Sequence, residues 1–252
     1  MQKRGEVRLL FFILMLVASL FAKEQRIVFS YSTPPYVFTD GSGIVMTIVK
    51  EALAYKGHTV TPIFVNIGRS IEMFKEGYVD GSSIIQTSSG LEAFYSKPFM
   101  QYHNAAFALE KRKLALTSID DLAHFHLIAF QNATKYLGET FEAMTHKAGK
   151  NYTEVADQKQ QVYRMVKGRT DVVVMDRHIF RYYYHVLLAE KKITAQERYT
   201  LYELFPPTQY QAAFKEKAMR DDFDAGVAHL KATGRYEAIY DEYSQRYFEV
   251  AR

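Results

Sequence analysis

The sequence predicts an α/β protein with two lobes, each built on a central, mostly parallel sheet flanked by helices. Two short apolar runs, residues 27–29 and 172–175, lack a helical period, as expected for strands buried on both faces of a sheet. Helical stripes follow such runs, and this alternation of strand and helix occurs twice along the chain. A chain of 252 residues is long enough for two domains, so the repeated pattern favours two lobes.

The composition excludes several classes of protein. Hydrophobic residues make up 48% of the chain and charged residues 24%, which is typical of a globular protein and not of a disordered one. The formal net charge is +4, and no run of Lys and Arg predicts nucleic-acid binding. The chain contains no cysteine, which excludes disulfides, zinc–thiolate sites, cysteine nucleophiles and a lipid-modified cysteine.

The first 22 residues are typical of a targeting segment. Lys3, Arg4 and Arg8 give a positive start, and residues 9–20 are uncharged over a length that suits a signal peptide and is short for a membrane span. Cleavage before Lys23 would release the rest of the chain, and an uncleaved anchor is the alternative. We expect a cleavable signal peptide, export to the periplasm and no lipid anchor.

Residues 27–57 form the first strand–loop–helix unit. After the strand, Tyr31, Tyr36 and Phe38 lie in a loop that two prolines stiffen, because proline fixes φ and removes a backbone donor. A helical stripe over residues 44–55 follows and ends at a glycine. In an open parallel sheet, such a unit makes a binding crevice at the strand ends. Ordinary packing, with the aromatic residues in the core, is the alternative.

The later elements continue this alternation. In the first half we expect a helix at residues 70–75 and strands at residues 59–65, 80–85 and 105–109. After the charged residues 111–113 the pattern restarts, with strands at residues 127–130 and 172–175 and helices at residues 118–122, 132–147, 158–167 and 177–188. Ser118 is expected to cap the first of these helices. The chain closes with extended segments at residues 199–205 and 210–214 and helices at residues 219–233 and 236–247.

Six motifs, from Tyr-Ser-Thr-Pro-Pro-Tyr near the start to Gly-Arg-Tyr-Glu-Ala-Ile-Tyr near the end, resemble those of a known family. They are similar to motifs of the bacterial extracellular solute-binding proteins of family 3, which serve polar amino acid uptake and have the type 2 periplasmic binding fold. The motifs lie at residues 31–36, 76–81, 95–99, 118–122, 168–176 and 233–243. Together they span nearly all of the chain after residue 22.

This resemblance implies how the chain is divided. Residues 23–110 with 203–252 would form the first lobe and residues 111–202 the second, joined by a hinge of two crossing strands near Leu109 and Tyr202. A small polar ligand would lie in the cleft between the lobes, and closure of the lobes around it would be the functional event.

The resemblance also assigns roles to residues of the second lobe. Asp176 matches the acidic residue that receives a ligand's α-amino group, and an N-cap for the following helix is the alternative. Asn132 and Thr134 match a helix start whose N–H groups receive the α-carboxylate, since the helix dipole favours an anion there. Plain capping is the alternative at this helix start, and the two roles are compatible.

The chain departs from the family at the carboxylate clamp. Family members carry Thr-Pro-Glu-Arg after the third strand, whereas this chain has a loop from Thr87 to Glu92 in which the arginine position falls on Ser89 or Glu92. Neither side chain can make the bidentate contact that arginine makes with a carboxylate. Thr87, Ser89 and Glu92 are candidate ligand residues. Arg69 is the nearest substitute for the clamp, and an ordinary surface arginine is the alternative.

Two kinds of ligand fit these candidates. The three aromatic residues of the first loop could enclose an apolar or cationic portion of a ligand, and with Asp176 and Glu92 they would suit an amine. Arg69 and Thr134 would instead suit an amino acid. The sequence leaves both ligands open.

We therefore expect a periplasmic solute-binding protein that hands a small polar solute, an amino acid or related amine, to an ABC importer in the inner membrane. A sensor of the same fold that signals to a membrane partner and a dehydratase-type enzyme are the alternatives. Glu92 and Asp176 are the acid–base candidates that an enzyme would need, and we expect no enzymatic activity. We also expect a monomer, no cofactor and no nucleic-acid partner. His124 and His126 could share a strand face, but no third metal ligand is evident, so we expect no metal site.

Overall fold

The structure is a computed structural model that describes residues 23–30, 33–65, 67–194 and 196–248. The expected signal peptide and Tyr31 lie outside the described residues. The described residues fall into two compact units, residues 23–100 with 210–244 (unit 1) and residues 101–209 with 245–248 (unit 2). In this part of the chain, no helix is both long enough and apolar enough to cross a membrane.

Unit 1 is built on a sheet with the strand order β2-β1-β3-β11-β4, and β5 also pairs with β11. β1 runs parallel to β2 and β3, whereas β11 runs antiparallel to β3 and β4. β2 is an edge strand, a position that tolerates Pro62. The strands are β1 (Glu24–Ser30), β2 (Thr59–Val65), β3 (Gly81–Ile85), β4 (Phe94–Tyr95), β5 (Met100–Tyr102) and β11 (Thr208–Phe214).

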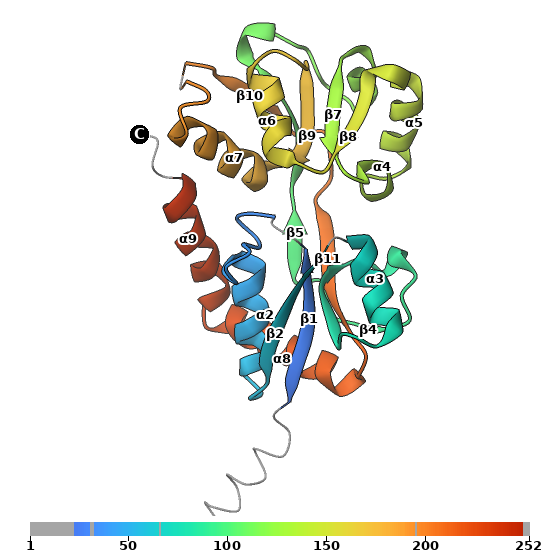
Figure 1. The fold of residues 1–252 in the computed structure, drawn as a ribbon, viewed down its shortest axis with the longest axis vertical. Coiled ribbons are helices and arrows are strands. Elements are labelled where there is room, and N and C mark those ends of the chain that lie inside the picture. The colour runs from blue at the N-terminus through green and yellow to red at the C-terminus, as the bar shows by residue number, and fades with distance from the viewer. Residues whose placement is uncertain (1–22, 31–32, 66, 195, 249–252) are drawn as a thin grey trace, which may run out of the picture. The chain divides into compact units, whose positions relative to one another are not determined.

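Helices cover both faces of this sheet. The crossovers from β1 to β2 and from β2 to β3 lead in opposite directions across the sheet, so right-handed connections place α2 and α3 on opposite faces, as Figure 1 shows. α8 packs against α2. The helical elements are α2 (Ile44–Ala54), α3 (Ile67–Glu76), the 3-10 turn η1 (Thr87–Ser89), α8 (Lys217–Ala232) and α9 (Arg235–Phe248).

Unit 2 repeats this arrangement, with the strand order β10-β6-β9-β7-β8. β7 runs parallel to β8 and β9, and β6 runs antiparallel to β9 and β10. The order β8-β7-β9-β6 therefore matches β2-β1-β3-β11, which confirms the predicted pair of similar α/β lobes, although both sheets are mixed and not mostly parallel. The strands are β6 (Asn104–Leu109), β7 (Leu127–Phe130), β8 (Tyr152–Val155), β9 (Val172–Asp176) and β10 (Tyr199–Tyr202).

The helices of unit 2 bury an apolar core against its sheet. Phe107 of β6 stacks on Phe180 of α7 with ring centroids 3.8 Å apart. Gln161 of α6 is fully buried and donates from Nε2 to the carbonyl oxygens of Ile128 and Val174 at 2.8 and 2.9 Å, which ties α6 to β7 and β9. The helical elements are η2 (Glu110–Arg112), η3 (Asp120–His124), α4 (Ala133–Tyr136), α5 (Glu139–Ala148), η4 (Gly149–Asn151), α6 (Gln158–Val166) and α7 (Arg177–Ala189).

The division of the chain differs from the one expected. The chain passes from unit 1 to unit 2 after Met100 and returns after Gln209, whereas the sequence placed these boundaries after residues 110 and 202. Tyr199 pairs with Leu109 and Tyr202 with Ala106, so the strands expected to form a hinge lie side by side within unit 2. The charged residues taken as a boundary form the turn η2 at the end of β6.

Two helix predictions also need correction. The helix expected over residues 132–147 is divided into α4 and α5 by Gly138, whose φ of 88° interrupts the helix. Ser118 is not an N-cap, because η3 begins later and has no side-chain cap. The carboxylate of Asp121 instead accepts hydrogen bonds from the N–H groups of Thr117 and Ser118, both at 2.8 Å.

A close backbone contact between α8 and α2 leads to a prediction. A Cβ on Gly226 would lie 1.9 Å from the carbonyl oxygen of Ala52. We expect Gly226→Ala to lower the free energy of unfolding by about 1–3 kcal/mol, because the added methyl group overpacks this contact. Helix propensity alone predicts a gain of about 1 kcal/mol for the same change, so the sign of the effect separates the two causes.

Denaturant unfolding followed by circular dichroism measures this effect. Ala228, which is exposed on the same helix, is the matched control, and Ala228→Gly should cost about 1 kcal/mol through propensity alone. A Gly226→Ala variant more stable than the wild type would contradict the close approach of the two helices.

Candidate functional site

The carboxyl ends of the parallel strands define the candidate site in each unit. In unit 2, β7, β8 and β9 run parallel, so their carboxyl ends lie at one edge of the sheet. This edge carries Asn132 and Thr134 after β7, Glu154 within β8, and Asp176 and Arg177 at the end of β9. It therefore gathers most of the charged and polar groups that the sequence assigned to the second lobe.

The corresponding edge of unit 1 carries a small polar cavity. Its volume is about 10 Å³, enough for one water molecule. The described residues that line it are uncharged, and four of them are serines. They are Val28, Ser30, Val65, Ser70, Ser82, Ser83 and Ile84. The edge of unit 1 thus offers hydroxyl groups and no ionised side chain at this cavity.

In unit 2, the start of α4 is occupied by a carboxylate of the chain itself. Glu154 Oε2 accepts a hydrogen bond from the N–H of Asn132 at 2.7 Å. Its Oε1 accepts from the N–H and the hydroxyl of Thr134, both at 3.1 Å, and from the phenol of Tyr152 at 2.7 Å. An ionised carboxylate has about two acceptor positions on each oxygen, so these donors fill Oε1 and leave one position open on Oε2.

These hydrogen bonds control the ionisation of the pair. Burial raises the pKa of Glu154, but the hydrogen bonds from Tyr152, Thr134 and Asn132 outweigh it, so the pKa lies below its usual value. The pKa of the Tyr152 phenol is raised, first by burial and then by its hydrogen bond to Glu154. Glu154 is therefore an anion at neutral pH, and the four donors that surround it are neutral.

Asp176 acts as the N-cap of α7 in the structure. Its Oδ1 accepts from the N–H groups of His178 and Ile179 at 2.8 and 3.2 Å, and its Oδ2 accepts from the N–H of His103 at 2.9 Å. The residue is 2% exposed. The capping alternative is therefore confirmed, and contact with a ligand stays a prediction.

Arg177 follows Asp176 and brings a positive charge to the same edge. Its guanidinium lies 4.0 Å from the carboxylate of Glu203, and its buried Nε has no hydrogen-bond partner. Burial and the Arg177 charge lower the pKa of His103 and bring the pKa of His178 to about 4, so both imidazoles are neutral at pH 7. Arg177 is the described residue of this edge that could accept a carboxylate.

The two described aromatic candidates of the first loop, Tyr36 and Phe38, make contacts within unit 1. Tyr36 is completely buried, and its carbonyl oxygen accepts from the N–H of Val45 at 2.9 Å. Phe38 stacks on Tyr243 of α9 with ring centroids 6.4 Å apart. Both residues pack within unit 1, in agreement with the core alternative, and Tyr31 lies outside the described residues.

The loop that lacks the family's arginine makes contacts within unit 1. The Ser89 hydroxyl lies 3.0 Å from the Tyr95 hydroxyl, while the side chains of Thr87 and Glu92 are exposed. Glu92 borders a separate open hollow with Phe74, Lys75, Gly90, Leu91 and Lys215. No residue of this loop therefore takes over the role of a carboxylate clamp.

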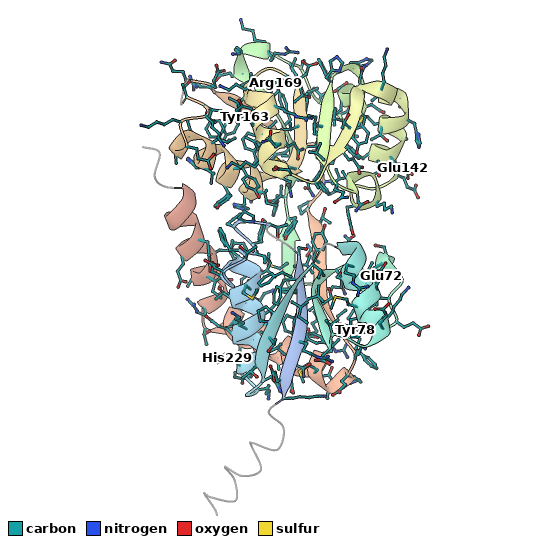
Figure 2. All side chains as sticks on the ribbon, viewed as in Figure 1. Glu72, Tyr78, Glu142, Tyr163, Arg169 and His229 are labelled. Atoms are coloured by element: carbon teal, nitrogen blue, oxygen red, sulfur yellow. The ribbon has the colours of Figure 1, made fainter. Side chains whose placement is uncertain are left out.

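Arg69 behaves as a surface arginine. Its Nη1 donates to Glu72 at 3.0 Å and lies 3.7 Å from Glu76, so its charge is shared with two carboxylates of α3, of which Glu72 is labelled in Figure 2. The side chain is 47% exposed. These contacts agree with the surface-arginine alternative, and contact of Arg69 with a ligand stays a prediction.

The sequence considered His124 and His126 as a possible pair of metal ligands. Both are exposed, and no group of three or more His, Asp or Glu residues in the described chain could hold a metal ion. The expectation of no metal site stays a prediction.

Sequence reasoning missed Glu154, Arg177 and the cavity serines. Glu154 was overlooked because β8 was not recognised as a strand, so nothing placed it beside the helix start at Asn132. Arg177 directly follows Asp176, and its position after the buried run of β9 was a signal that could have nominated it. The serines of β3 were visible as a small polar strand start without a reason to select them.

The strand order and the return of β11 to the first sheet define the type 2 periplasmic binding fold. No protein-family model and no curated protein matches the chain. Several solved structures match the chain, but their sequence identity is so low that the match supports only the fold. An ancestral arginine-binding protein bound to arginine matches with a TM-score of 0.68 and 17% identity, over 87% of this chain and 97% of that one.

Two further solved structures show the same likeness. A substrate-binding protein of an ABC uptake transporter from Streptococcus pneumoniae, with bound histidine, has a TM-score of 0.67 and 16% identity over 89% of this chain and 92% of that one. A histidine kinase sensor domain with similarity to periplasmic binding proteins has a TM-score of 0.66 and 18% identity over 87% of this chain and 95% of that one. The predicted fold is thus confirmed.

The hydrogen bonds of Glu154 lead to a pH-dependent prediction. We expect Glu154→Gln to lower the free energy of unfolding by about 1–3 kcal/mol at pH 7, because hydrogen bonds to a charged acceptor are lost. A carboxyl group whose pKa is depressed by folding stabilises the protein above its unfolded pKa of about 4.3, and this stabilisation is lost as the pH falls. The difference between wild type and variant should therefore shrink from pH 7 towards pH 3.

Urea unfolding at several pH values measures this difference. Glu142, exposed on α5 and labelled in Figure 2, provides the control variant Glu142→Gln, which should change stability little. An effect of Glu154→Gln that is the same at pH 7 and pH 3 would contradict the ionised network.

Proposed function

We propose that the protein is a periplasmic solute-binding protein that captures a small polar solute, an amino acid or related amine, for an ABC importer of the inner membrane. The observation that carries this proposal is the fold match over almost the whole length of solved amino-acid-binding proteins, including one bound to arginine and one with bound histidine. The apolar stretch in the first 22 residues supports export. No enzymatic activity is proposed.

The proposed ligand groups lie at the carboxyl ends of the strands. Asp176 of unit 2 keeps its proposed role towards an amino group, in addition to its role as a cap. Ser82 and Ser83 of unit 1 would supply neutral hydroxyl contacts, which suit either partner of a hydrogen bond. The expectation that the solute lies between the two lobes stays a prediction.

A second candidate function is a sensor of the same fold. The match to a histidine kinase sensor domain favours it, since that domain is as similar in fold as the transport proteins are. A permease gene beside this one would support transport, whereas a kinase or cyclase gene would support sensing.

A solute screen on the mature protein tests the proposed function. A bound solute should raise the free energy of unfolding by about 2.7 kcal/mol at one hundred times its Kd. We expect Asp176→Asn to lose this increase, because asparagine still caps a helix but carries no charge for an amino group. Thermal unfolding with amino acids, polyamines and small organic acids provides the measurement.

Asp157 provides a matched control for this variant. It caps α6 in the same unit by accepting from the N–H of Gln160 at 3.0 Å, so Asp157→Asn should keep the response to solute. A full response of Asp176→Asn would remove Asp176 from the site. A wild type that responds to no compound of the screen would argue against solute capture.

A further inference from the structure

We infer that the solute is an amine without a carboxylate, and that Glu154 is the residue that excludes amino acids. This inference rests on the proposed function and deepens it, because it selects one of the two ligand classes left open by the sequence. Glu154 belongs to none of the residues that the family resemblance assigned to the ligand. Its position beside the helix start of unit 2 is seen only in the folded chain.

The first argument is that the donors for a carboxylate are already used. The N–H groups of Asn132 and Thr134 both point to the carboxylate of Glu154, at 2.7 and 3.1 Å. These are the groups that the resemblance assigned to the α-carboxylate of an amino acid. An incoming carboxylate would have to displace Glu154 from these two N–H groups, and the displaced side chain would lose its hydrogen bonds and remain close by as a like charge.

The second argument is that the described candidates of unit 1 are poorly suited to replace these donors. The Ser89 hydroxyl is paired with Tyr95, and Glu92 carries a negative charge. Arg69 is shared between two carboxylates of its own helix. The small cavity at the strand ends is lined by hydroxyl groups, which can hydrogen-bond to either kind of ligand but supply no positive charge for a carboxylate.

The third argument concerns net charge. Tyr152, Thr134 and Asn132 are neutral, so they hold Glu154 in place without cancelling its negative charge. Such a charge attracts a cation and repels an anion over several ångströms. The same side chain therefore removes the donors for a carboxylate and favours an ammonium group.

Arg177 is the residue that could favour an amino acid over an amine. Its guanidinium lies at the same sheet edge, and its contact with Glu203 is long at 4.0 Å. A carboxylate bound there would bypass Glu154. The experiment must therefore include Arg177→Gln, which removes this possible anchor and leaves Glu154 unchanged.

Matched pairs of ligands test the inference directly. Arginine and agmatine, lysine and cadaverine, and histidine and histamine differ only in the carboxylate. Isothermal titration of the wild type should show an amine that binds at least about ten-fold more tightly than its amino acid. In Glu154→Ala this ratio should fall by at least about ten-fold, because the N–H groups of Asn132 and Thr134 become available and the like charge is removed. Arg177→Gln should keep or raise the wild-type ratio, because it removes a positive charge that favours a carboxylate.

The controls separate specificity from stability. Glu142→Ala, at an exposed position of unit 2, should keep the wild-type ratio. Glu154→Gln preserves the size of the side chain and removes its charge, so it replaces Glu154→Ala if that variant does not fold. Circular dichroism of each variant establishes that it is folded before titration.

The possible outcomes separate a failure of this inference from a failure of the proposed function. An amino acid that binds the wild type as tightly as its amine would overturn the inference and keep the proposed function. An unchanged ratio in folded Glu154 variants would also overturn it, and a loss of amino acid binding in Arg177→Gln would then identify the anchor. Binding of neither member of any pair, nor of any other compound of the screen, would overturn the proposed function and the inference together.

Discussion

Each sheet depends on an antiparallel strand that comes from a distant part of the chain. β11 follows all of unit 2 in sequence, yet Ala213 pairs with Ser82 of β3 and with Tyr95 of β4. The sheet of unit 1 is therefore completed by this strand, which leads into α8. α8 packs against α2, where Gly226 allows the helices to touch. In unit 2, β6 has the same role, and its register pairs Asn104 with Asp176. That register brings the N–H of His103 to the Asp176 carboxylate and so shapes the candidate site.

The sequence was most informative where one local signal dominated. The strands at residues 59–65 and 127–130 were predicted with the observed bounds, because each is a β-rich run between clear interruptions. β8 was missed because the pattern Tyr-Thr-Glu-Val carries little apolar signal, and its place is set by pairing with β7. The unit boundaries were displaced because a cluster of surface charges resembles a linker, whereas strand pairing across about ninety residues of sequence holds β6 and β10 in one sheet.

The candidate site was less predictable than the fold. Asp176 was placed correctly at a strand end, but sequence cannot separate a cap from a ligand group, because the same short carboxylate serves both. An aromatic loop residue such as Tyr36 has the same ambiguity between core and crevice, and its complete burial agrees with the core alternative. Glu154 could not be selected at all, since its partners Asn132 and Thr134 lie 22 and 20 residues away and meet it only through the register of β7 and β8.

A carboxylate that accepts backbone N–H groups is not in itself evidence of specificity. Asp121 binds the N–H groups of Thr117 and Ser118 in a similar way, and these contacts only close a turn. Glu154 differs in its place, because its four donors lie at the edge where the three parallel strands of unit 2 end. The charge also strengthens the hydrogen bonds of Glu154, so it is its position at this edge, and not the charge alone, that supports a role in specificity. An ionised group held by neutral donors at this edge keeps its full charge, and that charge distinguishes a cation from an anion.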